Sequence, residues 1–315
     1  MFAHRPLLVC TVIALLTACG GGGVTTSPPP PRPPAPVFDV VFDGVDADGA
    51  RVLYRIALEG GAPARIGAGY AGTRPNARAD GRALVYATVP TETEPSQLML
   101  IDDFTRPATV LSPGGVAERE PVWSPDGTRL AYFSQRDDAA GDVFVATLAN
   151  RRLEDVRNLT PRSSGEPLIS PDVTPAWSPD GTRLAFTSYR GGSAALWVMN
   201  ADGSQLRQLT PTSGAHGDYF PSWSPDGQRI AFQRINTAES RIGIVSASSG
   251  QIGFYEFDGR AYSPAWSPDG RWIAFSGLTG SELDIHVREA DGTQVRRIAR
   301  PGDDFSPAWI RRTTG

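Results

Sequence analysis

Trp123-Ser124-Pro125-Asp126-Gly127 is the first of four identical pentapeptides in this chain, and the others begin at Trp177, Trp223 and Trp266. Residues 77–81 form an eroded copy, and residues 306–309 form a truncated one. The six positions equivalent to the tryptophan lie 46, 54, 46, 43 and 43 residues apart. A repeat of this period indicates an architecture in which each unit is one supersecondary element.

The clearest unit runs from Pro175 to Thr210. Its Pro-Asp-Gly sequence predicts a turn, because proline presets φ, aspartate bonds its own backbone and glycine takes a positive φ. Short apolar and β-branched runs between Gly, Pro and Asp clusters indicate antiparallel strands, at 175–177, 183–188, 196–199 and 207–210. Four strands in about 43 residues are typical of a propeller blade.

The number of blades follows from the repeats. Five blades open at Ala77, Trp123, Trp177, Trp223 and Trp266. Residues 37–69 hold three further strand-like runs without an opening Pro-x-Trp strand, and residues 307–309 supply such a strand at the other end of the chain. We therefore predict an all-β fold, a six-bladed β-propeller with four antiparallel strands per blade. The C-terminal strand closes the first blade, which hides strand edges.

The pattern Pro-x-Trp-Ser-Pro-Asp-Gly-x-Arg-(Leu/Ile)-Ala-Phe resembles the TolB-like propeller repeat, a relative of the WD repeat, over about residues 37–310. The resemblance implies the fold strongly and the function weakly, because such blades occur in adaptors, transport accessories and peptidase propellers. TolB itself carries an α/β domain ahead of its propeller. Only 36 residues stand there in this chain, so we do not expect it to be TolB itself.

Residues 1–18 predict a lipoprotein signal peptide. A short apolar run, Leu7–Leu16, follows His4 and Arg5 and is too short for a permanent membrane helix. Leu16-Thr17-Ala18-Cys19 resembles the bacterial lipobox, which implies cleavage before Cys19 and lipidation of its sulfur; a plain cleavage site near Ala18 is the alternative. Because Gly20 rather than Asp follows, the resemblance implies an outer-membrane lipoprotein, and we expect it to face the periplasm.

Residues 19–36 are rich in Gly and then in Pro, which predicts a stiff polyproline tether behind the lipidated Cys19 and ahead of the propeller at 37–315. A leader without a role is the alternative. The chain has 34 acidic and 30 basic residues, all of the latter Arg, and a net charge of −4. This balance argues against nucleic acid as a partner. We expect a monomer.

No catalytic motif stands out, and we predict no catalytic residue, metal or cofactor. His286 aligns with Trp197 of another repeat, which predicts a packing role. His216 with Asp218 could ligate a metal, but two ligands are a weak case. Asp43, Asp46 and Asp48 depart from the standard Ca²⁺ spacing and favour a strand-connecting turn.

Aligning the repeats reveals a ring of variable residues just before each Pro-x-Trp strand, which is the innermost strand of its blade in this family. Four of the six residues five places before the tryptophan are acidic, and three of the six at the next place are aromatic. Such a ring at one mouth of the channel would bind a peptide amine or an Arg or Lys side chain through carboxylates and aromatic faces. The predicted site comprises Glu118, Arg119, Glu120, Asp172, Asp218, Tyr219, Tyr262, Asp304 and Phe305. Solvated loop residues with aromatics sealing the rim are the alternative.

These features favour a non-enzymatic envelope lipoprotein that binds a protein or peptide partner of the cell envelope at the channel mouth. The resemblance supports this class of partner, because TolB-like chains bind envelope lipoproteins. The alternative is a propeller enzyme, a lyase or hydrolase of extracellular polymers, that would use a metal with His216, Asp218 and Glu120. A third possibility is a peptidase propeller whose hydrolase is a separate chain.

Overall fold

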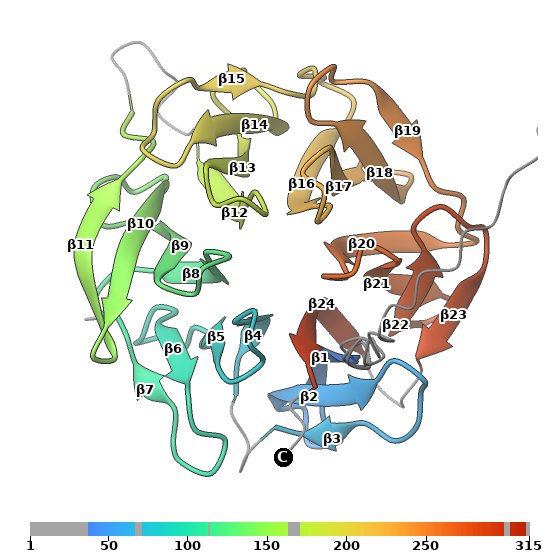
Figure 1. Cartoon of the computed structure of the whole chain (residues 1–315), viewed down its shortest axis with the longest axis horizontal. Coiled ribbons are helices and arrows are strands. Elements are labelled where there is room, and N and C mark those ends of the chain that lie inside the picture. Colours follow the sequence, from blue (N-terminus) through green and yellow to red (C-terminus); the bar gives the residue numbers. More distant parts are fainter. Residues whose placement is uncertain (1–36, 67–70, 113, 163–170, 299–302, 313–315) are drawn as a thin grey trace, which may run out of the picture. The chain divides into compact units, whose positions relative to one another are not determined.

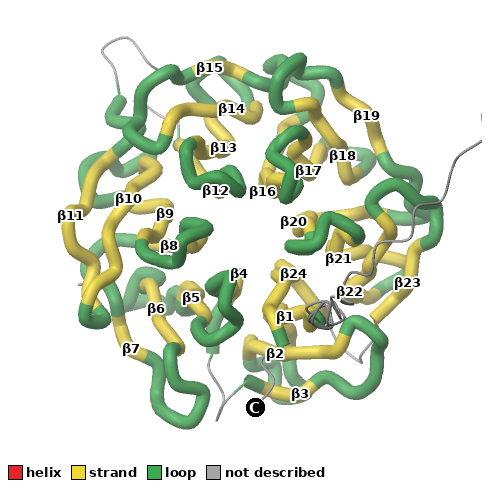
Figure 2. The backbone as a smooth tube through the Cα atoms, viewed as in Figure 1, coloured by secondary structure: helices red, strands yellow, loops and turns green. Residues whose placement is uncertain are grey.

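The computed structural model describes residues 37–66, 71–112, 114–162, 171–298 and 303–312. Within these ranges the chain forms 24 strands and no helix. The strands build six four-stranded antiparallel sheets arranged as blades around a central axis (Figure 1, Figure 2). The predicted six-bladed β-propeller is therefore confirmed. The predicted signal peptide, Cys19 and the tether lie outside the described residues.

In every blade the strands follow one another from the channel to the outer rim. From the inside outwards, blade 1 consists of β24 (Asp304–Arg311), β1 (Phe38–Val45), β2 (Arg51–Ala57) and β3 (Ala64–Arg65). Blade 2 consists of β4 (Thr73–Ala77), β5 (Leu84–Ala87), β6 (Leu98–Ile101) and β7 (Thr109–Val110). Blade 3 consists of β8 (Glu118–Trp123), β9 (Arg129–Ser134), β10 (Asp142–Ala149) and β11 (Arg152–Asn158). Blade 4 consists of β12 (Asp172–Trp177), β13 (Arg183–Ser188), β14 (Ala195–Asn200) and β15 (Arg207–Gln208). Blade 5 consists of β16 (Gly217–Trp223), β17 (Arg229–Ile235), β18 (Ser240–Ser246) and β19 (Ile252–Phe254). Blade 6 consists of β20 (Arg260–Trp266), β21 (Trp272–Thr279), β22 (Glu282–Glu289) and β23 (Val295–Ile298).

The two ends of the propeller meet in blade 1. Strands β1 and β24 pair antiparallel from Phe38 opposite Arg311 to Gly44 opposite Asp304. Trp309 of β24 is 8% exposed and packs in one cluster with Phe38 and Val40 of β1. Closure by the last strand therefore gives β1 both a hydrogen-bonding partner and an apolar neighbour.

The Ser-Pro-Asp-Gly turn forms the bonds that its sequence predicts. In blade 3, Oδ1 of Asp126 accepts the Thr128 N–H at 3.0 Å and the Ser124 hydroxyl at 2.5 Å. Gly127 follows with φ of 69°, a conformation that glycine adopts without steric cost. The equivalent aspartates of three other blades bind in the same way: Asp180, Asp226 and Asp269. The Ser178 hydroxyl lowers the pKa of Asp180 to about 2.

Arginine and tryptophan of successive repeats tie neighbouring blades together. The guanidinium of Arg129 lies 4.6 Å from the ring centre of Trp177 in the next blade. The same contact joins Arg183 to Trp223 at 4.8 Å and Arg229 to Trp266 at 4.9 Å. Each is a cation–π contact on a largely buried ring. The repeated tryptophans are therefore structural, as predicted.

His286 occupies the predicted packing position. It lies opposite Phe275 in the β21–β22 pair, as Trp197 lies opposite Phe186 in the β13–β14 pair. Its ring is buried and stacks on Phe275 with centroids 5.5 Å apart. Burial lowers the pKa of His286, which keeps the imidazole neutral inside this aromatic cluster.

Candidate functional site

Every innermost strand bends at one residue in the left-handed region. These residues have φ between 45° and 59°, and they are Arg74, Glu120, Thr174, Phe220, Ser263 and Ser306. The strand register shifts at the same places, so each marks a β-bulge. A proline follows each of them in the sequence. Proline lacks an N–H and is tolerated on an edge strand, as these channel-facing strands are.

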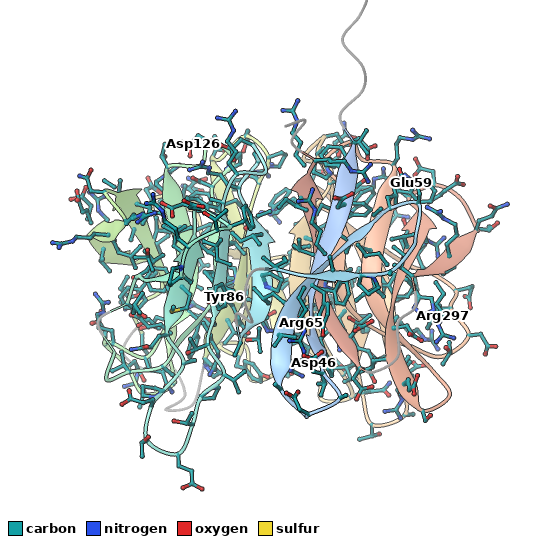
Figure 3. The ribbon with its side chains drawn as sticks, turned by 90° about the horizontal axis from the view of Figure 1, so that it is seen from below. Asp46, Glu59, Arg65, Tyr86, Asp126 and Arg297 are labelled. Carbon is teal, nitrogen blue, oxygen red and sulfur yellow. The ribbon has the colours of Figure 1, made fainter. Side chains whose placement is uncertain are left out.

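The bulges border a cavity of about 270 Å³ inside the central channel. Its walls contain the six prolines that follow the bulges and small side chains such as Ala176, Ala265 and Ala308. The lining continues to Trp123 and to Pro125 in the turn beyond it. Asp126 of that turn lies at one face of the propeller, and Asp46 lies at the opposite face (Figure 3). The cavity therefore extends from the bulges towards the face that carries the Trp-Ser-Pro-Asp-Gly turns.

One side-chain contact crosses the channel at the level of the bulges. Arg74 belongs to blade 2 and Phe220 to blade 5, and their strands β4 and β16 lie on opposite sides of the ring (Figure 1). The guanidinium carbon of Arg74 lies 4.0 Å from the ring centre of Phe220. Nε of Arg74 is also 3.7 Å from Oε1 of Glu120 in blade 3. These three side chains narrow the channel and form a floor for the cavity.

Polar side chains fix the bulges from the preceding blade. Oε2 of Glu120 accepts the backbone N–H of Thr174 at 2.7 Å, and Oδ1 of Asp43 accepts that of Arg74 at 3.1 Å. Burial raises the pKa of Asp43, which the Arg74 N–H and the Arg51 guanidinium oppose. Glu120 therefore both lines the cavity and holds the next blade in place.

The four acidic residues of the predicted ring are buried, which corrects the expectation that they face a ligand. Glu118, Asp172, Asp218 and Asp304 are each at most 1% exposed. Glu118 pairs with Arg136 at 2.9 Å, and Asp172 pairs with Arg190. Asp218 binds Arg234 through both oxygens, at 2.6 and 2.7 Å. A carboxylate removed from water needs such a partner, and these three partners come from the same blade. Burial raises the pKa of Asp172.

The other predicted residues, apart from Glu120, are half-buried and lie outside the cavity lining. Arg119 stacks on Phe133 with its guanidinium 3.9 Å from the ring centre, and Arg51 lies 4.2 Å from the centre of Phe305. The hydroxyls of Tyr219 and Tyr189 are 2.7 Å apart. Tyr262 occupies the equivalent place in blade 6. Of the nine predicted residues, the structure thus brings only Glu120 into the cavity.

Two features of the site did not emerge from the sequence. An arginine recurs near the end of the second strand in blades 3, 4 and 5, as Arg136, Arg190 and Arg234. This recurrence in the sequence indicated that the acids of the ring have arginine partners. Arg74 and Phe220 were aligned but were not connected. Six blades in chain order place blade 2 opposite blade 5, but the sequence does not show which side chains of these blades reach the axis.

The aspartates of the alternative metal sites bind other groups of the chain. Both oxygens of Asp218 bind Arg234. Asp46 binds Tyr54 and Arg65, with Arg65 beside it in Figure 3, and Asp48 accepts the Ala50 N–H at 3.2 Å. These bonds agree with a strand-connecting turn. Among the described residues, no group of three or more His, Cys, Asp or Glu side chains is placed to hold a metal ion.

Comparison with protein families identifies the class of this propeller. The family model described as TolB beta propeller domain matches residues 117–220 and 218–314, more than half of the chain. The chain belongs to the TolB β-propeller family. The TolB-like propeller is similar to the Tol-Pal system protein TolB of Methylococcus capsulatus, with 33% identity over 93 residues, 29% of this chain and 20% of that protein. It is also similar to the uncharacterized peptidase YuxL of Bacillus subtilis, with 32% identity over 115 residues, 36% of this chain and 16% of that protein.

A solved structure shares the fold at low identity. The crystal structure of TolB from Acinetobacter baumannii superposes with a TM-score of 0.68 and 19% identity, covering 88% of this chain and 67% of that one. The matches to the curated relatives span about a fifth or less of their lengths. These similarities establish the family and the fold of the TolB-like propeller. In the part of the chain that the structure describes, no helix is long and apolar enough to cross a membrane.

Proposed function

We propose that this TolB-like propeller binds a protein or peptide partner of the cell envelope through its central channel. The observation that carries the proposal is the cavity of about 270 Å³ at the axis of the ring, lined mainly by Pro, Ala and Trp side chains with a smaller number of polar groups. Such a composition is typical of binding sites. Membership of the TolB family and the similarity to a Tol-Pal system protein support an envelope partner.

We place the primary contact in the cavity. The four acids of the predicted ring, at the other mouth of the channel, are buried, and three of them are paired with arginines. Glu120 belongs to this contact, with Arg74 and Phe220 beside it. Arg119, Tyr219, Tyr262 and Phe305 remain candidates for a second contact at the opposite mouth, since each is half-buried.

Photocrosslinking in intact envelopes tests this placement. We expect p-benzoylphenylalanine at Val122, which lines the cavity, to give a discrete protein adduct, because the side chain there would touch the inserted partner. The same group at Val110, 52% exposed on the outer strand β7, is the matched control and should give none. The group at Tyr262 reports on the opposite mouth. Adducts from Val110 or Tyr262 but none from Val122 would contradict the cavity as the site.

We further propose that the mature protein is an outer-membrane lipoprotein, lipidated at Cys19 and tethered by residues 20–36. The lipobox-like Leu16-Thr17-Ala18-Cys19 supports this, and acyl chains contribute about 0.8 kcal/mol per buried methylene, so several chains anchor durably.

The anchor is tested by Cys19→Ala, which removes the sulfur that would carry the lipid. We expect the variant to move from the membrane pellet to the soluble fraction after cell fractionation, and to lose incorporation of labelled fatty acid. Lipidation would be refuted if the variant stays in the membrane pellet and the wild-type protein incorporates no labelled fatty acid. Cys10→Ala, inside the predicted signal peptide, is the control and should not change the distribution.

A further inference from the structure

Arg74 is the most unusual residue of the cavity. The equivalent positions of the other blades carry Glu120, Thr174, Phe220, Ser263 and Ser306. Among the described residues that line the cavity, Arg74 is the one cation and Glu120 the one anion. The remaining lining is mainly proline, tryptophan, alanine and hydroxyl side chains. A single guanidinium at the floor of a narrow apolar cavity is poorly explained as a solvated surface charge.

The contacts of Arg74 hold its guanidinium without using up its donors. The guanidinium carbon lies over the face of Phe220, 4.0 Å from the ring centre, and a cation–π contact of this kind occupies no particular N–H group. The ion pair with Glu120 is loose, with Nε and Oε1 3.7 Å apart. The other oxygen of Glu120 is bound to the Thr174 N–H. A guanidinium has five N–H donors, and the Arg74 side chain is 31% exposed, so donors remain for a ligand.

The floor also limits how a peptide can bind. Arg74 and Phe220 meet across the channel from opposite blades, so a chain that enters from the face of the Trp-Ser-Pro-Asp-Gly turns meets the floor end-on. A chain terminus fits this geometry better than a side chain from a passing loop. The predicted ligand of the acidic ring was a peptide amine or an Arg or Lys side chain. Such a cation would lack accessible partners there, because four of the ring's carboxylates are buried.

We propose that the floor of the cavity binds the C-terminal carboxylate of an extended peptide, with Arg74 as the anchoring residue. This deepens the proposed function and rests on it. A carboxylate can accept two parallel N–H bonds from one guanidinium, and the bond is stronger where water is partly excluded. The prolines and alanines of the walls leave room for an extended chain, and the contact with Phe220 holds the guanidinium at the floor of the cavity before binding.

The test uses the full-length protein, immobilised, and an equimolar library of hexapeptides prepared once with free C-terminal carboxylates and once amidated. We expect the free acids to be retained roughly ten- to a hundredfold more than the amides, the difference typical of a hydrogen-bonded charge pair. Arg74→Gln should remove this preference and Arg74→Lys should keep part of it. Arg82→Gln, an exposed arginine beyond the same strand, should keep all of it.

Thermal unfolding of each variant shows whether the fold is intact, and only folded variants are compared. Equal retention of acids and amides by the wild type would overturn the inference, and so would a preference that survives Arg74→Gln. Retention of neither library would also overturn it. An adduct from p-benzoylphenylalanine at Val122 would still support binding in the cavity, so failure of the carboxylate anchor is distinguishable from failure of the proposed function.

Discussion

A chain ending at Asp303, which lacks β24, is expected to lose the cooperative unfolding transition of the propeller. β24 is the innermost strand of blade 1 and pairs with β1 over most of its length. Its loss leaves β1 with an open edge and removes Trp309 and Ile310 from the core. Deleting one large buried side chain costs about 3–5 kcal/mol, and a whole domain is stable by only about 5–15 kcal/mol. Calorimetry and circular dichroism measure the loss.

A chain ending at Arg312 is the matched control, because it keeps every described residue, and it should unfold as the full-length protein does. A synthetic peptide of residues 303–312 added to the shorter chain should restore a transition if the missing strand alone is responsible. A sharp transition at the wild-type temperature in the chain ending at Asp303 would contradict closure by β24.

Substitution of the buried acids should change stability rather than ligand capture. Asp218→Asn weakens both bonds to Arg234 and leaves a guanidinium, only 18% exposed, without its counter-ion. Breaking a buried pair in this way costs about 3–5 kcal/mol, and we expect the lower end because Arg234 keeps some contact with water. The melting temperature should fall by roughly 6–10 °C.

Asp258→Asn is the matched control, since this aspartate is exposed in the loop before β20, and it should change the melting temperature by less than about 2 °C. Combining Asp218→Asn with Arg234→Gln should cost less than the sum of the single changes, because the two groups form one pair. An unchanged melting temperature for Asp218→Asn together with lost partner capture would instead restore the carboxylate ring as a binding surface.

The role of a residue was predictable where it depends on contacts within one repeat or on its position in the alignment of the repeats. Asp126 and Gly127 lie in a turn whose bonds span two to five residues, so the local sequence was sufficient to predict it. His286 could be assigned to packing because the alignment places it at the Trp197 position. The arginine that stacks on the next tryptophan, as Arg129 does on Trp177, was visible as a pattern, but its contact was not, because it reaches across 48 residues of chain.

The nine residues of the predicted site all lie on innermost strands, but eight of them lie outside the cavity lining. The alignment placed Glu118 and Glu120, five and three positions before Trp123, in the same channel mouth, yet Glu118 is buried against Arg136 while Glu120 lines the cavity. The β-bulge decides this difference, because one extra residue changes the face to which the following side chains point. Counting positions back from the tryptophan does not reveal this change of face.

The sequence by itself determined the period, the turns, the number of blades and the closure by the last strand, since these depend on local conformational preferences and on a repeat that is written four times in full. Only the tertiary structure decided which acids are buried and which charged residue reaches the axis. The ring sets blade 2 opposite blade 5, so Arg74 and Phe220, 146 positions apart in the chain, meet across the channel. Such a contact depends on the closed ring as a whole and on no single repeat.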